Sequence, residues 1–157
     1  MTMIIDGTNG LTFNDSSVQA TAGKILQVVQ GTASTFVSST NTTTVDTGLS
    51  ATITPKFSNS KILVLVSQRF FRNPACDHGV VYLLRNSTTL ITHNRVGLVD
   101  NNAAGADQVW NCNYLDSPAT TSATTYKTRF NNTNTNGVFY CMLDSNQAQI
   151  TLLEIAA

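Results

Sequence analysis

The sequence predicts an all-β fold, a sandwich of two antiparallel sheets. Its longest apolar stretch, Lys61–Arg72, is rich in β-branched residues and has no 3.6-residue stripe, which indicates a central strand and not a helix. Short apolar runs recur along the rest of the chain between clusters of Asn, Asp, Ser, Thr, Gly and Pro, and no stretch has a convincing helical periodicity. Short strands separated by turns at a spacing of roughly 8–12 residues are typical of such a sandwich.

The central stretch predicts more burial than one sheet face provides. Successive side chains of a strand point to opposite faces, so one face carries Ile62, Val64, Val66 and Phe70, and the other carries Leu63, Leu65 and Phe71. A sheet with one solvated face has polar residues at every second position, yet Ile62 to Val66 contains none. Because full burial of a large aliphatic side chain contributes roughly 1.5–3 kcal/mol, the second face predicts an oligomer. The same two-faced apolar pattern occurs in Val80–Leu84, Val138–Leu143 and Ile150–Ile155.

The remaining strands follow in order between turn signals. Asp46-Thr47-Gly48 predicts a turn, and Asn131–Gly137 is the most polar tip of the chain. We expect the other strands at Ile25–Gln30, Phe36–Val37, Thr42–Thr47, Ala51–Thr54, Val80–Arg85, Leu90–His93, Gln108–Leu115, Tyr126–Phe130, Val138–Leu143 and Gln149–Ile155.

The first part of the chain differs from the rest. Met3–Ala22 has turn signals on both sides of the short alternating piece Leu11-Thr12-Phe13 and too few apolar residues to fold alone. We therefore expect two parts, an N-terminal stalk or attachment segment over residues 1–23 and a head domain over residues 24–157.

Composition and charge exclude several classes of partner. Charged residues make up 11% of the 157 residues, against about 25% in average proteins. The formal net charge is zero and the pI is about 6.7, so the chain lacks the basic footprint of a nucleic-acid-binding or lipid-binding protein. The sequence has neither a signal-peptide pattern at Met1–Gly10 nor an apolar run of about 20 residues. These features predict a soluble protein made in a cytoplasm.

The sequence predicts no enzyme, metal or cofactor. Cys76-Asp77-His78 is the only cluster of metal-ligand residue types, and only the distant His93 adds an imidazole, whereas zinc sites need three or four ligands. We interpret this cluster as a solvated loop. Neither histidine lies in a recognisable nucleophile motif, and the few carboxylates fall mostly in turns.

Two further residue types have structural interpretations. Trp110 shares a strand face with Cys112 and Tyr114, which favours burial over a role as a sugar platform. Cys112 and Cys141 lie in apolar strands, which predicts buried free thiols, whereas Cys76 falls in a predicted loop and could be exposed.

Several stretches together resemble a module of tail-fibre and other virion proteins of tailed bacteriophages, notably marine and cyanobacterial ones. The opening Ile5-Asp6-Gly7, Gly10–Phe13 and Gln19–Ala22 looks like the short stalk segment that often precedes such heads. The head part of the resemblance covers Thr47–Pro55, Ser60–Val66, Tyr114–Pro118, Thr121–Lys127 and Ile150–Ala157.

This resemblance implies a jelly-roll head of the tumour-necrosis-factor and C1q kind, assembled as a homotrimer on an intertwined stalk. It implies a virion structural protein, made in the host bacterial cytoplasm and often involved in host attachment, and it transfers no catalytic or ligand residue. The anchor is then Met1–Gly23 or another virion protein. Our candidates for virion attachment are Ile4, Ile5, Leu11 and Phe13.

Host recognition is expected in the loops that join the strands. The longest or most polar of these are Arg72–His78, Asn101–Asp107 and Asn131–Asn136, whose side chains suit hydrogen bonding to a host surface glycan. Our candidates for receptor contact are Asn101, Asn102 and Asp107. Two alternatives stay open, a lectin-like carbohydrate-binding module without a virion role and a capsid decoration protein that binds no receptor.

Overall fold

The computed structural model describes residues 4–6, 10–12, 18–19, 25–97, 105–142 and 146–157. Over these residues the chain contains strands and turns and no helix, as predicted. The strands are β1 (Ile4–Asp6), β2 (Gly10–Thr12), β3 (Val18–Gln19), β4 (Ile25–Ala33), β5 (Val37–Ser39), β6 (Val45–Ile53), β7 (Lys61–Arg72), β8 (Gly79–Arg85), β9 (Thr88–Val96), β10 (Ala106–Asp116), β11 (Thr124–Asn132), β12 (Phe139–Cys141) and β13 (Ala148–Ile155).

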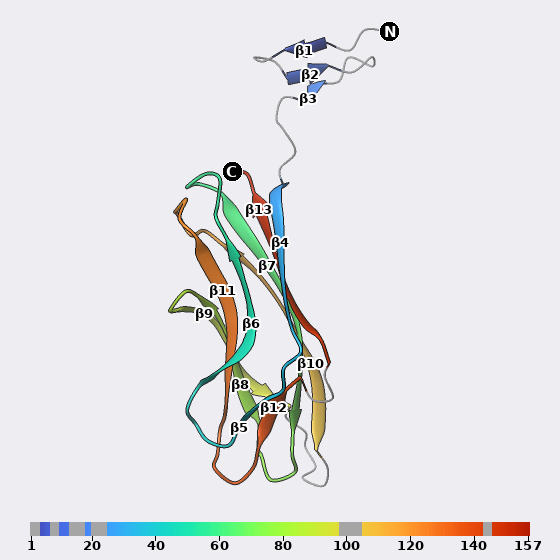
Figure 1. Cartoon of the computed structure of the whole chain (residues 1–157), viewed down its shortest axis with the longest axis vertical. Coiled ribbons are helices and arrows are strands. Elements are labelled where there is room, and N and C mark those ends of the chain that lie inside the picture. The colour runs from blue at the N-terminus through green and yellow to red at the C-terminus, as the bar shows by residue number, and fades with distance from the viewer. Residues whose placement is uncertain (1–3, 7–9, 13–17, 20–24, 98–104, 143–145) are drawn as a thin grey trace.

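Two antiparallel sheets form the sandwich (Figure 1). One is six-stranded, in the order β4-β13-β7-β12-β5, with β10 paired to the other side of β7. The second is four-stranded, in the order β6-β11-β8-β9. The eight long strands therefore face each other as β4-β13-β7-β10 and β6-β11-β8-β9, which is the double Greek-key order of a jelly roll. The predicted fold class is confirmed.

The central strand has the bounds that the sequence predicts. β7 spans Lys61–Arg72 and pairs with β13 on one side and β10 on the other. Its inward side chains Ile62, Val64 and Phe70 are fully buried, while outward Leu65 is 40% exposed. One face of the strand thus lies in the core, and the other is not covered within a single chain.

An aromatic cluster fills the core at the end of the sandwich away from the chain termini. Phe70 stacks on Phe139 with ring centroids 5.4 Å apart, and Phe130 meets both rings edge-on. All three side chains are fully buried. Aromatic pairs at such distances contribute roughly 0.5–1.5 kcal/mol each beyond the burial of their area.

Two strand predictions are wrong in detail. No turn forms at Asp46-Thr47-Gly48, because β6 runs through it. Gly48 takes a φ of +85°, and the strand continues past a bulge opposite Thr128, between Lys127 and Arg129. The strand predicted over Val138–Leu143 is only β12, since Met142 has a φ of +56° and leaves the sheet.

The two-faced apolar pattern of β8 has a cause within the chain. Its outward residues Val80 and Leu84 are 7% and 5% exposed, so the second face of this strand is already covered. On β7, by contrast, the outward Leu65 stays exposed.

Candidate interaction surfaces

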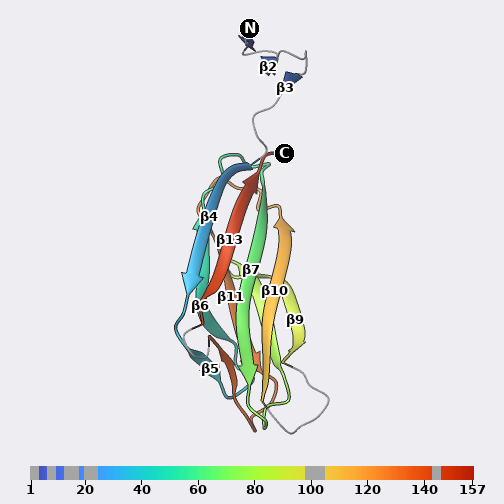
Figure 2. The same ribbon diagram turned by 90° about the vertical axis from the view of Figure 1, so that its right-hand side faces the viewer.

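The outer face of the six-stranded sheet is a candidate interaction surface, because the strands of this sheet carry five of the seven exposed large apolar side chains of the described residues. Figure 2 shows its strands β4, β13, β7 and β10 side by side. Antiparallel pairing aligns their outward side chains in rows across the sheet. The first row is apolar, and we call it the aliphatic row; it contains Val28, Leu153, Leu63 and Leu115.

The aliphatic row is open to solvent at both ends. Val28 on β4 is 58% exposed and Leu115 on β10 is 49% exposed. Leu65, one row further along β7, is also exposed, and Ile25 lies at the start of β4 with 56% of its surface accessible. Large apolar side chains gathered on one sheet face mark an interaction surface.

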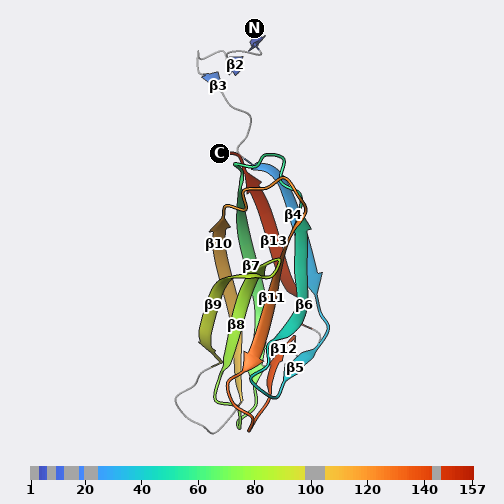
Figure 3. The ribbon, with the colours of Figure 1, turned by 90° about the vertical axis from the view of Figure 1, so that its left-hand side faces the viewer.

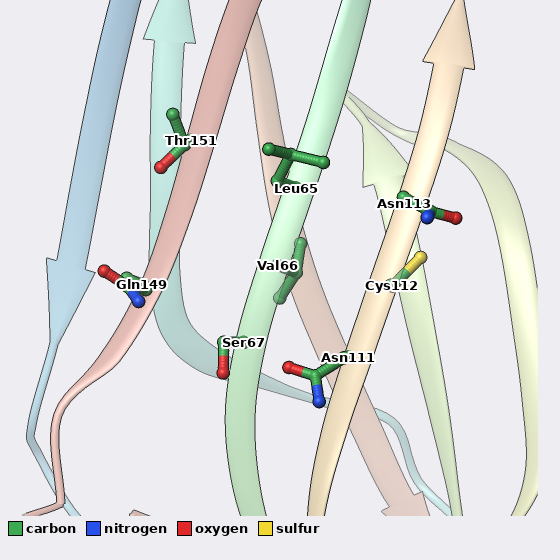
Figure 4. A pocket seen from close by; sticks show the side chains of 8 residues that line it. All are labelled: Leu65, Val66, Ser67, Asn111, Cys112, Asn113, Gln149 and Thr151. Atoms are coloured by element: carbon green, nitrogen blue, oxygen red, sulfur yellow. The ribbon is translucent and has the colours of Figure 1, made fainter.

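Polar side chains occupy the next two rows, which we call the amide belt. The belt consists of Gln30, Thr32, Asn111, Asn113, Gln149, Thr151 and Ser67, with Leu65 among them. Gln30 donates hydrogen bonds to Gln149 and Thr151, both at 3.3 Å. A shallow depression of about 390 Å³ lies over the belt, because small Ser67 sits between the longer Gln149 and Asn111 (Figure 4).

Below the belt the face carries one ion pair and a second apolar group. Arg69 donates to both carboxylate oxygens of Asp107, with its Nε 2.7 Å and 2.8 Å from them. This hydrogen bond holds the pKa of Asp107 below its usual value. Tyr140 packs between Phe71 and Phe36, with both pairs of ring centroids 5.6 Å apart.

The outer face of the four-stranded sheet has a different character. Figure 3 shows this side, with β9, β8, β11 and β6 toward the viewer. Asp46 forms ion pairs with Lys127 and Arg129 there, and Ser50 and Thr52 extend the polar surface along β6. Among the described residues, no exposed large apolar side chain belongs to a strand of this sheet.

The loops at the end away from the termini are held by buried polar side chains. Arg72, only 1% exposed, donates from Nε to the carbonyl of Gly97 at 2.8 Å and from Nη1 to that of Cys76 at 2.6 Å. The Asn73 carbonyl oxygen of the side chain accepts from the backbone N–H groups of Cys76 and Val138, both at 3.0 Å. These bonds fix the β7–β8 loop against the β11–β12 loop.

Two sequence expectations for this end are wrong. Cys76 is fully buried, and its thiol donates to the side chain of Asn132 at 3.0 Å; burial raises the pKa of Cys76 to about 11. The loop predicted over Asn131–Asn136 begins two residues later, because Asn131 and Asn132 belong to β11 and are buried. Asn132 also donates to the carbonyl of Gly137 at 2.7 Å, so its amide acts as a structural link.

The structure describes only one of the three predicted receptor-contact residues. Asn101 and Asn102 lie outside the described residues. Asp107 lies in β10 and not in a loop, and its carboxylate is engaged by Arg69. A substitution of Asp107 therefore removes an ion pair as well as a surface oxygen.

The predicted attachment residues lie in the N-terminal strands. Ile4 and Ile5 belong to β1 and Leu11 to β2, with Ile5 paired to Leu11. Phe13 lies outside the described residues. β1, β2 and β3 form a three-stranded antiparallel sheet of their own.

The described part of the chain contains no group of three or more His, Cys, Asp or Glu residues that could hold a metal ion. His78 instead bonds to Asp77 at 2.8 Å. Trp110 is in the core, 2% exposed, and donates from Nε1 to Nδ1 of His93 at 2.8 Å, as its predicted burial requires. Within the same described ranges, no helix is long and apolar enough to cross a membrane.

The sequence predicts only part of the amide belt. Asn111 and Asn113 alternate with Trp110, Cys112 and Tyr114, which places them on the outward face of their strand. That Gln149 and Thr151 lie in the same rows follows from the pairing of β13 with β7, which no local pattern encodes.

Comparisons with known proteins find no matching family model and no matching curated protein. Among solved structures, the Gt strain of infectious bursal disease virus aligns at 15% identity, over 90% of this chain and 39% of that chain, with a TM-score of 0.44. T=1 particles derived from the same virus align at 14% identity over 98% and 44%, with a TM-score of 0.42. A VP2 subviral particle of that virus aligns at 14% identity over 90% and 40%, with a TM-score of 0.39.

This chain spans about two fifths of the length of those viral chains. All three neighbours are structures of one virus or of particles derived from it. Similarity at this level concerns the arrangement of strands and carries no inference about function. The resemblance to fibre heads of tailed bacteriophages stays a prediction from the sequence.

Proposed function

We propose that this protein is a structural component of a bacteriophage particle, a homotrimeric fibre head that takes part in host attachment and has no catalytic activity. The observation that supports it most is the exposed aliphatic row on an otherwise well-packed jelly roll. In a monomer, Val28, Leu65 and Leu115 would stay 40–58% exposed on one sheet face. Apolar side chains grouped in this way mark an interaction surface.

Two further features agree with this proposal. The N-terminal strands β1, β2 and β3 have three, three and two residues, which is too little to be stable alone. They suit a segment that gains its burial from neighbouring copies or from another virion protein. The Arg72 and Asn132 hydrogen bonds make the opposite end a rigid support for loops, as a recognition surface requires.

The test of particle membership is direct. An antibody against the head should label purified phage particles at a fibre or at a fixed capsid position, and protein digests of the particles should contain this chain. Absence from purified particles would exclude the virion role and favour a free carbohydrate-binding module.

The attachment role has a separate test. Soluble protein added to host cells should compete with phage adsorption, and a double Asn101→Ala, Asn102→Ala variant should compete at least tenfold less well. A Thr52→Ala variant on the four-stranded sheet is the matched control and should compete like the wild type. If none of the three proteins reduces phage adsorption, the attachment role is excluded, and the protein is a decoration protein without receptor binding.

A further inference from the structure

We propose that copies of this chain join through the outer face of the six-stranded sheet, with the aliphatic row as the dry part of the contact and the amide belt as its polar part. This inference rests on the proposed function, which makes the chain a homotrimer. It adds which face is buried between copies, and which residues decide the association.

The first step is the contrast between the two outer faces. Val28, Leu65, Val109 and Leu115 are all exposed large apolar residues on strands of the six-stranded sheet. The four-stranded sheet presents instead the charged group of Asp46, Lys127 and Arg129. Burial of an apolar face against a partner is favourable at about 25 cal/mol per Å², so the six-stranded face is the one that gains from association.

The second step is charge. When three copies bring this face to a common axis, any net charge on the face is repeated in each copy and repels itself. In the rows from the aliphatic row down to Phe71, the described charges are Arg69 and Asp107, which form a bidentate pair and cancel. Lys61 lies beyond the aliphatic row, at the margin of the face. The face therefore tolerates its own copy.

The third step is hydrogen bonding. The belt is built from amides and hydroxyls, and each amide both donates and accepts. Asn111 and Asn113 can therefore bond to amides or hydroxyls of the belt in a neighbouring copy, whereas a face of carboxylates or ammonium groups could not pair with its own copies. This complementarity favours another copy of the chain over an unrelated protein.

The fourth step concerns a glycan as the occupant. Sugar rings are usually held on flat aromatic side chains with one polar edge. The aliphatic row has branched aliphatic residues in place of a ring, and Trp110 is inside the core. The nearest aromatic group, Phe71 with Tyr140, lies beyond the belt at the far end of the face. The row thus favours protein contact.

The experiment compares the mass of the full-length protein with that of two double variants. Leu63→Glu with Leu115→Glu places two carboxylates in the aliphatic row, and Ser50→Glu with Thr52→Glu places two on the outward side of β6. Wild type and the β6 variant should be species of three times the 16.9 kDa chain by light scattering. The row variant should raise the dissociation concentration about a hundredfold or more, because a buried unpaired charge costs several kcal/mol and about 1.4 kcal/mol is tenfold.

A second measurement keeps the test independent of folding. Cys112 is only partly buried and lines the depression on this face, so it is first replaced by Ala, while the native Cys76 and Cys141 are fully buried. Leu65→Cys and Thr52→Cys then introduce thiols on the two outer faces. With Leu63 and Leu115 unchanged, the maleimide reaction at position 65 should be at least tenfold slower than at position 52. In the row variant the two rates should become similar, and circular dichroism should report the same strand content.

Each outcome decides between the two proposals. A wild-type protein that stays at 16.9 kDa overturns both the homotrimer and this interface. A trimer that survives both Leu→Glu substitutions, with a rapidly labelled cysteine at position 65, overturns the interface and leaves the proposed function standing. Protection of position 65 that appears only when another particle protein or a glycan is added assigns the face to that ligand and also overturns the interface.

Discussion

Single buried polar side chains fasten the ends of this sandwich. Glu154 is fully buried near the end of β13, where its Oε1 accepts from the backbone N–H of Lys56 at 2.7 Å and its Oε2 from Gln27 at 2.6 Å. At the opposite end, Arg72 donates hydrogen bonds to the carbonyls of Gly97 and Cys76. Each of these residues holds a loop whose backbone groups would otherwise be buried without a partner.

Glu154 makes stability depend on acid. Burial alone raises the pKa of this carboxyl, but hydrogen bonds from Gln27, Ser60 and the backbone of Lys56 and Phe57 outweigh it, so its pKa lies below the ordinary value of 4.5. The folded protein then binds fewer protons at this site than the unfolded chain. The stabilisation is complete above pH 4.5 and is lost as pH falls through the folded-state pKa.

We therefore expect Glu154→Gln to destabilise the fold by about 1–3 kcal/mol at neutral pH and to flatten the loss of stability in acid. Urea unfolding measures both effects when it is repeated from about pH 3 to about pH 7, the range over which glutamate side chains lose their protons. Asp46→Asn is the control, because Asp46 is an exposed partner in surface ion pairs worth about 0–1 kcal/mol. Equal acid sensitivity of wild type and Glu154→Gln would contradict the assignment.

His93 supports the only tryptophan of the chain. Its Nδ1 accepts the hydrogen bond from the buried indole of Trp110, so His93→Ala leaves that N–H without its partner. We expect a loss of about 1–3 kcal/mol and a shift of the tryptophan emission. Thr92→Ala, at the neighbouring exposed position, should change neither the stability nor the spectrum.

At the scale of elements, β4 and β6 lie close together at one edge of the sandwich because Gly31 has no side chain. A Cβ at Gly31 would overlap the carbonyl oxygen of Ser50, so the absence of one lets β4 pass directly over β6. A Cβ at Gly48 on β6 would have open space around it to 4 Å, and the requirement for glycine there is the backbone φ of +85°. The two glycines thus serve the same strand pair for different reasons.

Gly31→Ala should lower stability by about 1–3 kcal/mol, because backbone must shift to make room. Gly48→Ala should cost about 1–2 kcal/mol from conformation alone. Chemical denaturation of both variants beside Ser34→Ala, at an exposed position just after β4, measures the difference. A Gly31→Ala protein as stable as Ser34→Ala would show that β4 does not lie this close to β6.

The strength of a local pattern decided which elements the sequence could predict. β7 was predictable to the residue because its twelve positions include three β-branched and two aromatic side chains and no Gly, Pro, Asn or Asp. β6 was not, because Asp-Thr-Gly has the composition of a turn and only the pairing with β11 keeps it extended. Tertiary pairing likewise decided that Cys76 is buried, although it lies in a loop.

The candidate surface was predictable in the same uneven way. The apolar second face of β7 showed in the sequence, which predicts a partner for it. Which residues share that face depends on the register of four strands far apart in the chain, such as Leu153 with Leu63 and Leu63 with Leu115. Register is a property of the folded sheet, and its rows are invisible to any window of neighbouring residues.

At the scale of the whole molecule, the jelly roll has a continuous core of its own. Its buried residues run from Leu49 on β6 to Leu152 on β13, and β4 contributes Val29 and Ala33 from its inward side. The head thus builds a core from its own strands.

Removal of residues 1–22 should therefore leave a folded head. We expect the strand signal in circular dichroism and the cooperative unfolding of the full-length protein to persist, with a melting temperature within a few degrees, since changes outside the core are usually worth about 0.5 kcal/mol or less. Incorporation into particles should fail, because the segment with Ile4, Ile5 and Leu11 is the proposed attachment site. The measurement is recovery of tagged protein in purified particles after complementation of a deletion phage.

A full-length Ile5→Asp, Leu11→Asp variant separates loss of these apolar side chains from loss of chain length, because the substitutions fall on paired positions of β1 and β2. Truncated protein that enters particles at the wild-type level would transfer the attachment site to the head.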